Sequence, residues 1–473
     1  IIAIAAAQLS SDGQPWSIIK LGPDEAAMLT RFAVLTSLVV IVSGLANLYH
    51  SRFKAIWSSF VTLAPLLLVT QVYFLTARVT GETQWASIAA ILAIGYLLLA
   101  DLIRRRSPSS QLVIWLTFGG HFAASLVAMI LTQEGKLTLA FALQIVSTAW
   151  IIRAFGLKEI GWLLKLLVAI VVIRLTLNPW LANYPTAEHW TLITYGGSTL
   201  CCMAAAYLLR GYPSINKWAE AAALHLFVLF LWSELRYWLH NGNIFIETAT
   251  LLETSLSLIL FGALSIVYFR RSLVSQNLKP LYGIFSLVLM LMALACYAVI
   301  LLNTLMQNDW VWAHIGETPG WNELLLAFGM PIVLGVLSWR YHHDSWRSLA
   351  LSFSAAASFI FINLQIKHLW QGDIRLYESM QSAELYTHSL VWLLIAVFAM
   401  LTAGKYFGTY AKQAYRVGLL LLGLVIAKLF LIDMSGLDGL LRVASFMGLG
   451  LSLLGISYLH QRLQTSLNKL GSE

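Results

Sequence analysis

The feature that most constrains the fold is a series of about fifteen apolar stretches that follow one another along the whole chain. Each is close to the roughly 20 residues that a helix needs to cross a bilayer. Several are apolar on every side, which is typical of helices in lipid or in a bundle core. They cover residues 27–48, 55–76, 85–103, 112–131, 137–152, 160–177, 190–209, 218–239, 249–269, 281–305, 324–339, 349–369, 385–403, 417–431 and 440–459. The sequence therefore predicts an all-α, polytopic transmembrane helix bundle of about fifteen spans.

Composition agrees with this fold class. Apolar residues make up 59% of the 473 residues and charged residues only 11%, with a mean hydropathy of +0.76. A water-soluble domain cannot bury that much apolar surface. The connections are short, so any function is expected in or beside the bilayer. The chain opens inside an apolar run, residues 1–9, without Met, and we expect it to be the later part of a longer protein.

Basic residues predict the orientation of the bundle. Nineteen of the 30 Lys and Arg residues lie in one alternate set of connections and the C-terminal tail, and five lie in the other set. Short loops rich in Lys and Arg stay in the cytoplasm, which predicts a bacterial plasma (inner) membrane protein with a cytoplasmic C-terminus. Anionic cytoplasmic lipid accounts for the net charge of +8. The lipid bilayer is the expected partner; nucleic acid is not, because no basic cluster exceeds Arg104-Arg105-Arg106.

The opposite set of connections combines acidic with aromatic residues. Trp and Tyr at this depth form the aromatic belt of ordinary membrane proteins, or they stack on a sugar or lipid headgroup. The acidic residues make a surface that binds a cation or a polyol conceivable. The residues concerned include Glu188, Glu247, Asp309, Glu317, Asp373 and Glu378 among Trp180, Tyr184, Trp310, Trp312, Trp370 and Tyr377.

An internal repeat is visible in the second half of the chain. Residues of functional type recur at a nearly constant sequence offset. The offset from Arg236 to Lys367 equals that from Glu253 to Glu384, and the offset from Tyr195-Gly196 to Phe328-Gly329 is almost the same. This constancy indicates a duplicated unit of four helices. Because four is an even number, both copies have the same orientation, which makes the repeat parallel.

The repeat predicts four regions. Residues 1–157 form N-terminal transmembrane helices, in which a degraded third copy is a further hypothesis. Residues 158–275 and 276–411 are the two four-helix units. Residues 412–473 form a C-terminal helical hairpin and a cytoplasmic tail.

Ionisable residues inside the predicted spans are the candidate site. Each would cost about 2.5–3.5 kcal/mol at the bilayer centre, yet these lie near the ends predicted to face outward. They are interpreted either as snorkelling side chains and ion pairs that join adjacent helices, or as the lining of an outward-facing polar cavity. The candidates for ligand binding or structural ion pairs are Arg174, Glu234, Arg236, Glu253, Lys367, Glu384, His388, Lys428, Asp433, Asp438 and Arg442.

The last hairpin, residues 428–442, has the highest density of these groups. Asp438 and Arg442 have the i, i+4 spacing of a pair on one helix face. Small residues then recur on one face of the following helix, which allows close helix packing. We interpret the hairpin first as a structural clasp and second as part of a site.

Histidine and cysteine suggest no cofactor. Glu384 and His388 have a spacing that metal sites use, but no second Glu/His pair accompanies them, and a hydrogen-bonded pair is the preferred interpretation. His121 and His225 are expected to bond neighbouring helices rather than haem. Neither a metal nor a cofactor is predicted, and no catalytic motif is recognised. The three cysteines, Cys201, Cys202 and Cys296, are interpreted as small buried residues.

Six motifs carry a family resemblance. They are Lys428-Leu-Phe-Leu-Ile-Asp433, Arg442-Val-Ala-Ser-Phe446-Met-Gly448-Leu-Gly450, Tyr458-Leu-His-Gln-Arg462, Arg174-Leu-Thr-Leu-Asn178-Pro179, Trp321-Asn322-Glu-Leu-Leu-Leu-Ala-Phe328-Gly329 and Ala383-Glu384-Leu-Tyr-Thr-His-Ser389-Leu-Val-Trp392. With these motifs the chain resembles an uncharacterised family of large bacterial many-pass membrane proteins, described as a domain of unknown function. The resemblance spans most of residues 136–463 and implies the architecture far more than an activity. It also implies a longer protein, because members have more N-terminal helices.

Three functional hypotheses follow. The first is transport or flipping of a polar envelope molecule, a glycan or a lipid headgroup, through an outward-facing polar cavity. The second is a membrane-embedded transferase or hydrolase with Glu253 or Glu384 as base. The third is a structural scaffold for cell-envelope assembly, favoured if all charges are paired.

Overall fold

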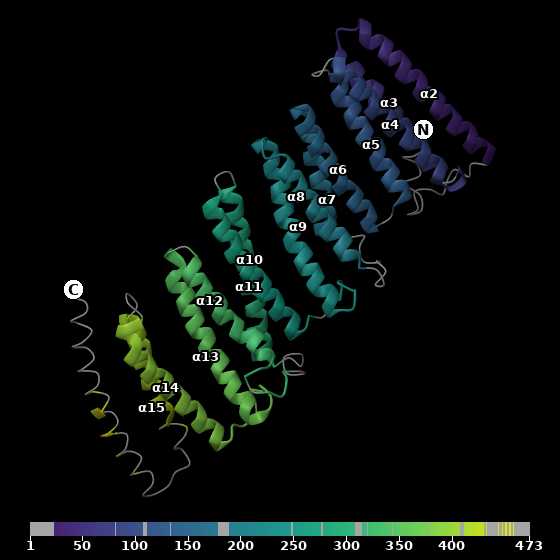
Figure 1. Ribbon diagram of the computed structural model, residues 1–473. Helices are drawn as coiled ribbons and strands as arrows, with labels where there is room; N and C mark the ends of the chain where they lie inside the picture. Colours follow the sequence, from purple (N-terminus) through teal and green to yellow (C-terminus); the bar gives the residue numbers. More distant parts are fainter. Residues whose placement is uncertain are drawn as a thin grey trace, which may run out of the picture. The chain divides into compact units, whose positions relative to one another are not determined.

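The computed structural model describes residues 23–80, 82–106, 111–132, 134–177, 189–246, 249–275, 278–307, 315–318, 320–342, 344–376, 378–406 and 411–429, with isolated residues between 432 and 457. Regular structure in these residues is helical throughout (Figure 1). The all-α prediction is therefore confirmed. The predicted stretch 440–459 and the site candidates Asp433, Asp438 and Arg442 lie outside the described residues.

Each of the first fourteen predicted stretches coincides with a helix. The α-helices are α2 (Pro23–His50), α3 (Lys54–Thr80), α4 (Glu82–Arg106), α5 (Gln111–Leu131), α6 (Glu134–Phe155), α7 (Gly161–Leu177), α8 (Gly197–Leu208), α9 (Pro213–Leu239), α10 (Leu251–Val274), α11 (Lys279–Met306), α12 (Met330–Tyr341), α13 (Arg347–Gln371), α14 (Ser382–Tyr406) and α15 (Ala411–Lys428).

Many of these helices suit a bilayer. Eleven helices in the described part of the chain are long and apolar enough to cross a membrane, and two shorter apolar segments are Leu192–Leu208 and Leu325–Tyr341. Large apolar side chains project outward, as on α2, where Leu35, Val39 and Val42 are 63–66% exposed. Water disfavours such a surface, whereas lipid accepts it. The multi-pass prediction is confirmed, and the number of about fifteen spans stays a prediction.

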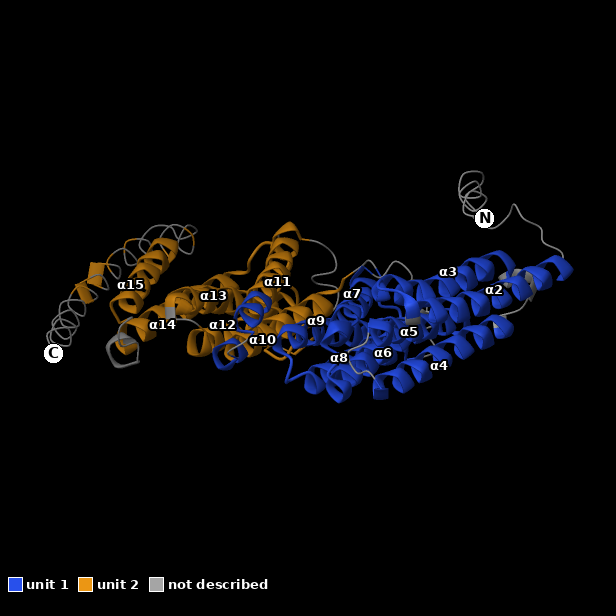
Figure 2. Cartoon of the chain, turned by 90° about the horizontal axis from the view of Figure 1, so that it is seen from above, with its two compact units in different colours: residues 1–248, 271–285 blue, residues 249–270, 286–473 orange. Residues whose placement is uncertain are grey.

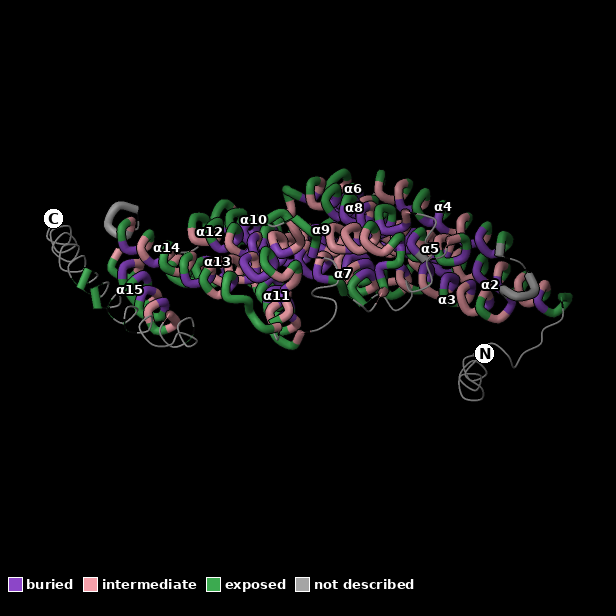
Figure 3. The backbone as a smooth tube through the Cα atoms, turned by 90° about the horizontal axis from the view of Figure 1, so that it is seen from below, coloured by how far each residue is buried: buried purple, intermediate pink, exposed green. Residues whose placement is uncertain are grey.

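The chain divides into two units, coloured separately in Figure 2: Ile1–Thr248 with Arg271–Phe285, and Ala249–Arg270 with Ser286–Glu473. Each unit has a buried core of its own. In the first, α6 to α9 bury residues such as Ile145, Leu164 and Ala205. In the second, α10 to α13 bury residues such as Ile300 and Phe328. Figure 3 shows buried and exposed residues alternating along the helices, as expected when one face packs on neighbours.

Two π-helices interrupt the regular pattern. Leu192–Gly196 precedes α8 and Leu325–Gly329 precedes α12, and each of these α-helices has 12 residues. Such wide turns are rare in proteins, and those that occur are often at functional sites. They contain the pairs Tyr195-Gly196 and Phe328-Gly329, which occupy matching positions of the proposed internal repeat. The coincidence supports the repeat hypothesis.

The long helices that follow, α9 and α13, also end alike. Asn241, just after the end of α9, has a φ of 50°, and Gly372, directly after α13, has a φ of 75°. Left-handed residues terminate helices in this way, and Gly and Asn adopt the conformation at least cost. The sequence offset between these two positions is the same as that from Arg236 to Lys367.

Candidate functional site

A buried ion pair joins α13 to α14. The ammonium Nζ of Lys367 lies 3.8 Å from the carboxylate Oε1 of Glu384, and the two side chains are only 2% and 0% exposed. Lys367 lies in the last turns of α13 and Glu384 in the first turn of α14. The dipole of α13 favours a cation at its C-terminus, and that of α14 favours an anion at its N-terminus. The helix ends therefore explain why each charge has its sign.

The ion pair is incompletely hydrogen-bonded. Gln371 donates from Nε2 to Oε2 of Glu384 at 2.7 Å. Among the described atoms, however, Lys367 Nζ, Glu384 Oε1, Gln371 Oε1 and the Nε2 of neighbouring His368 are buried without a hydrogen-bond partner. A buried charge is costly unless it is paired and hydrogen-bonded, so this arrangement keeps unused donors and acceptors in one place.

His388 belongs to a second set of contacts on the same helix. Its Nδ1 lies 2.9 Å from Oδ1 of Asn363 on α13, which also accepts a 2.9 Å hydrogen bond from the indole Nε1 of Trp392. Glu384 and His388 thus bond different residues of α13. Both side chains are therefore linked to α13, and the pair between them stays a prediction.

Lys428, the last residue of α15, reaches the same end of α14. Its Nζ donates to the carbonyl oxygen of Leu385 at 3.0 Å and to Oγ of Ser389 at 2.6 Å. The ends of α13, α14 and α15 therefore gather four predicted candidates, Lys367, Glu384, His388 and Lys428. We call these four residues the polar site.

A neighbouring hydrogen-bond group was not among the predicted site residues. Gln365 on α13 accepts at Oε1 from the backbone N–H of Gly320 (3.1 Å) and from Nδ2 of Asn322 (3.3 Å), and its own Nε2 donates to Oδ1 of Asn322 (2.9 Å). Asn322 also lies 3.3 Å from Nδ1 of His368. This group anchors the loop before the second π-helix to α13.

An equivalent group occurs in the first unit. Glu234 on α9 accepts from Oγ1 of Thr191 at 2.7 Å and lies 2.7 Å from Nε2 of His189, and both partners closely precede the first π-helix. The ring of His189 stacks on Tyr237 at 4.2 Å. Glu234 and Gln365 are separated by the same offset as Arg236 and Lys367, so the repeat was the signal that would have identified Gln365.

Three other described candidates, Arg174, Arg236 and Glu253, bond residues outside the polar site. Arg174 donates from Nε to Oγ1 of Thr138 on α6 at 2.7 Å, so this side chain bonds a neighbouring helix. Arg236 donates to the carbonyl oxygen of Ile246 in the hairpin after α9. Glu253 is 4% exposed, and its backbone N–H bonds Thr250 Oγ1 at 3.1 Å.

The two histidines and three cysteines singled out in the sequence lie on described helices. His121 is 4% exposed on α5, and His225 on α9 lies 2.8 Å from Oγ1 of Thr176 on α7, as expected for a bond between helices. Cys201 and Cys202 are buried and Cys296 is partly buried; all three are free thiols.

The chain was compared with curated proteins, with solved structures and with protein families, and the family match agrees with the membrane fold. No curated protein and no solved structure matches the chain. The family described as predicted membrane protein (DUF2339) matches residues 3–463, nearly the whole length. This match confirms the resemblance inferred from the sequence motifs. The chain belongs to this family of many-pass membrane proteins, DUF2339.

Proposed function

We propose that the protein recognises a polar molecule of the cell envelope, a glycan or a lipid headgroup, at the polar site and carries it across or along the bilayer. In the proposed topology, about fifteen spans cross a bacterial inner membrane and the C-terminus is cytoplasmic. The basic connections then face the cytoplasm, and the polar site faces outward.

The observation that carries this proposal is the buried pair of Lys367 and Glu384. Ionisable groups inside membrane helices are rare and are usually functional. Lys367 Nζ offers donors, whereas Glu384 Oε1 and Gln371 Oε1 are acceptors, and these atoms have no hydrogen-bond partner among the described residues. A hydroxyl group both donates and accepts, so a ligand rich in hydroxyls would satisfy the whole set.

Binding would require the ends of α13 and α14 to separate. Because Lys367 and Glu384 are 2% and 0% exposed, the pair neutralises itself while the site is closed. An entering ligand would exchange the ion pair for charge-assisted hydrogen bonds to each partner, which are stronger than neutral ones. An acid–base role for Glu384 would need the same opening.

The proposed parallel repeat of residues 158–275 and 276–411 supports a dedicated role for these ends. Glu234 and Gln365 each hold the loop before a π-helix against the following long helix. Transporters often carry their substrate sites between repeated units built from interrupted helices. Repeat units with a π-helix at matched positions fit that design.

A structural clasp is the second candidate function. Lys428 bonds two groups of α14, and Lys367 joins α13 to α14, so both cations tie neighbouring helices. In that case the polar site would hold the bundle together for a scaffold in the envelope. A test must therefore separate binding from stability.

The test removes both charges together. The full chain, wild type and the double variant Lys367→Met/Glu384→Met, would be purified from bacterial membranes and incubated with a total extract of envelope lipids and glycans. Retained molecules would be identified by native mass spectrometry. We expect the wild type to retain a hydroxyl-rich molecule and the double variant to lose it, because Met offers neither a strong donor nor a strong acceptor.

The control is an exposed ion pair in the same hairpin, Arg375→Met/Glu378→Met, whose side chains are 42% and 38% exposed. This variant should retain the molecule as the wild type does. If the double variant at the polar site retains the molecule equally well, the binding proposal is wrong. A double variant that is less stable but still retains the molecule would indicate the clasp.

A further inference from the structure

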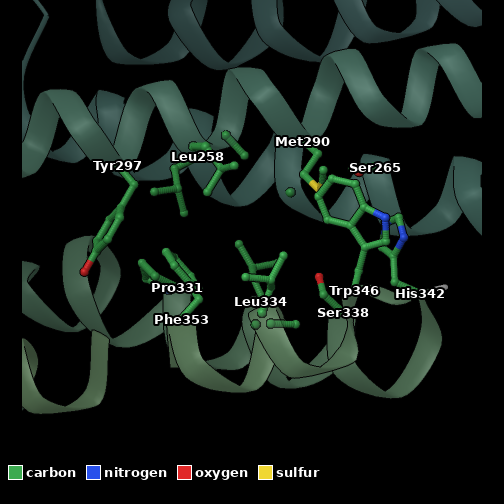
Figure 4. A pocket seen from close by; sticks show the side chains of 16 residues that line it. Leu258, Ser265, Met290, Tyr297, Pro331, Leu334, Ser338, His342, Trp346 and Phe353 are labelled. Atoms are coloured by element: carbon green, nitrogen blue, oxygen red, sulfur yellow. The ribbon is translucent and has the colours of Figure 1, made fainter. Parts of the chain in front are cut away.

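An apolar groove runs between α10, α11, α12 and α13 in the second unit. Its volume is about 310 Å³. Figure 4 shows Tyr297 and Phe353 at one end and His342 and Trp346 at the other, with Leu258 and Leu334 between them. A groove with this lining does not suit a glycan, which needs many hydrogen bonds.

Small residues lie where the helices around the groove pack closely. Gly262 on α10, Ala293 on α11 and Gly335 on α12 are among its lining residues, and a Cβ at Gly262 would lie 2.7 Å from Cδ1 of Leu334. A Cβ at Gly335 would lie 2.1 Å from Oγ of Ser354 and 3.2 Å from the carbonyl oxygen of Ala350. The glycine therefore lets α12 approach α13 closely beside the groove.

One end of the groove is basic and aromatic. The guanidinium groups of Arg270 and Arg340 each lie 5.7 Å from the centre of the Tyr341 ring, one from α10 and one from α12. Beside them, His342 stacks on Phe269 at 4.1 Å. Both arginines are exposed. The His342 end of the groove therefore lies near two positive charges held against one Tyr ring, and their sign attracts anionic headgroups.

We propose that this groove binds one anionic phospholipid of the bilayer, with an acyl chain along the apolar lining and the phosphate between Arg270 and Arg340. The groove contributes apolar burial, which every phospholipid would use. The two guanidinium groups bind phosphate oxygens with directed hydrogen bonds. Their positive charge favours a headgroup of net negative charge over one in which a cation such as choline offsets the phosphate.

The lipid site is independent of the polar site. The groove contacts α13 through its first turns, up to Phe353, whereas Lys367 lies near the end of the same helix. The charge distribution of the sequence places Arg270 and Arg340 on the cytoplasmic side, where anionic lipid is concentrated.

The experiment measures lipid retention by the purified full chain. Delipidated protein in detergent is titrated with phosphatidylglycerol or phosphatidylcholine of identical chains, and binding is followed by native mass spectrometry. We expect phosphatidylglycerol to bind the wild type more tightly. Arg270→Gln/Arg340→Gln should weaken phosphatidylglycerol binding roughly tenfold to thirtyfold and phosphatidylcholine binding clearly less, because choline offsets the phosphate charge of phosphatidylcholine.

A second variant tests the groove itself. Ser338→Phe places a ring in the lining and should reduce binding of both lipids, whereas Leu337→Phe, at the preceding position of α12 and outside the lining, should not. Lys412→Gln/Arg416→Gln removes the same charge from the exposed start of α15 and should leave the preference intact. Circular dichroism and gel filtration confirm folding of each variant.

Equal binding of the two lipids by the wild type would overturn the proposal. So would an equal loss in the Arg270/Arg340 and Lys412/Arg416 variants, which would indicate attraction by net charge alone. Unchanged lipid binding by the folded Ser338→Phe variant would show that the acyl chain of the lipid does not lie in the groove.

Discussion

Lys367 and Glu384 show how helix ends make a buried charge tolerable. Each lies at the end of a helix whose dipole favours its sign, and each is close enough to the other for ion pairing at 3.8 Å. Both were predicted as site residues, as ionisable groups inside spans and as equivalents of Arg236 and Glu253, and ion pairing between adjacent helices was one interpretation without named partners. Their mutual pairing depends on the packing of α13 against α14, which no sequence spacing encodes.

Removing one partner of this pair should be far more harmful than removing both. Lys367→Met leaves the Glu384 carboxylate buried without its cation, and the free energy of unfolding should fall by about 3–5 kcal/mol. Lys367→Met/Glu384→Met should recover most of that loss, because apolar residues of similar volume pack in place of the pair. Denaturation of the detergent-solubilised proteins provides the measurement. A double variant no more stable than the single one would contradict this account of the pair.

The helices themselves were predictable from the sequence, whereas their irregularities were not. Apolar runs of bilayer length mark where helices α2 to α15 lie, since lipid forces every backbone group into internal hydrogen bonds. No sequence pattern predicts the π-helices at Leu192–Gly196 and Leu325–Gly329, because a wide turn depends on how neighbouring helices pack around it. Gly196 and Gly329, which match across the proposed repeat, indicated that the two segments are equivalent but not that they form π-helices.

Glycines at helix contacts provide the prediction at this scale. Gly335→Ala should destabilise the protein by about 1–3 kcal/mol, because the new Cβ would lie 2.1 Å from Ser354 Oγ and push α12 away from α13. Gly423→Ala on α15 is the matched control, since a Cβ there meets nothing within 4 Å. Ala is the better helix former, so the control should be neutral or more stable by up to about 1 kcal/mol. Equal effects of the two substitutions on the thermal midpoint would refute the contact.

Across the whole molecule, charge and hydropathy predicted the class and a sidedness, whereas the polar site had to come from three-dimensional contacts. Glu384, His388 and Lys428 are not recognisable as one site from their positions in the chain, yet α13, α14 and α15 bring them to one set of helix ends. The family match establishes a membrane protein, and the eleven apolar helices of the described residues make it many-pass. Sidedness and the parallel repeat are the predictions that connect this class to an outward polar site.

Labelling of single cysteines tests that central claim most directly. In a chain with Cys201, Cys202 and Cys296 replaced by Ala, Asn243→Cys marks the hairpin after α9 and Ser379→Cys the hairpin after α13. Ser214→Cys and Ser345→Cys, which occupy equivalent positions of the two repeats, mark the basic turns before those helices. A membrane-impermeant maleimide added to intact cells should label both hairpin positions and neither basic turn. Labelling of only one hairpin would mean that one of the four helices between them does not cross, and the parallel repeat with its outward polar site would be wrong.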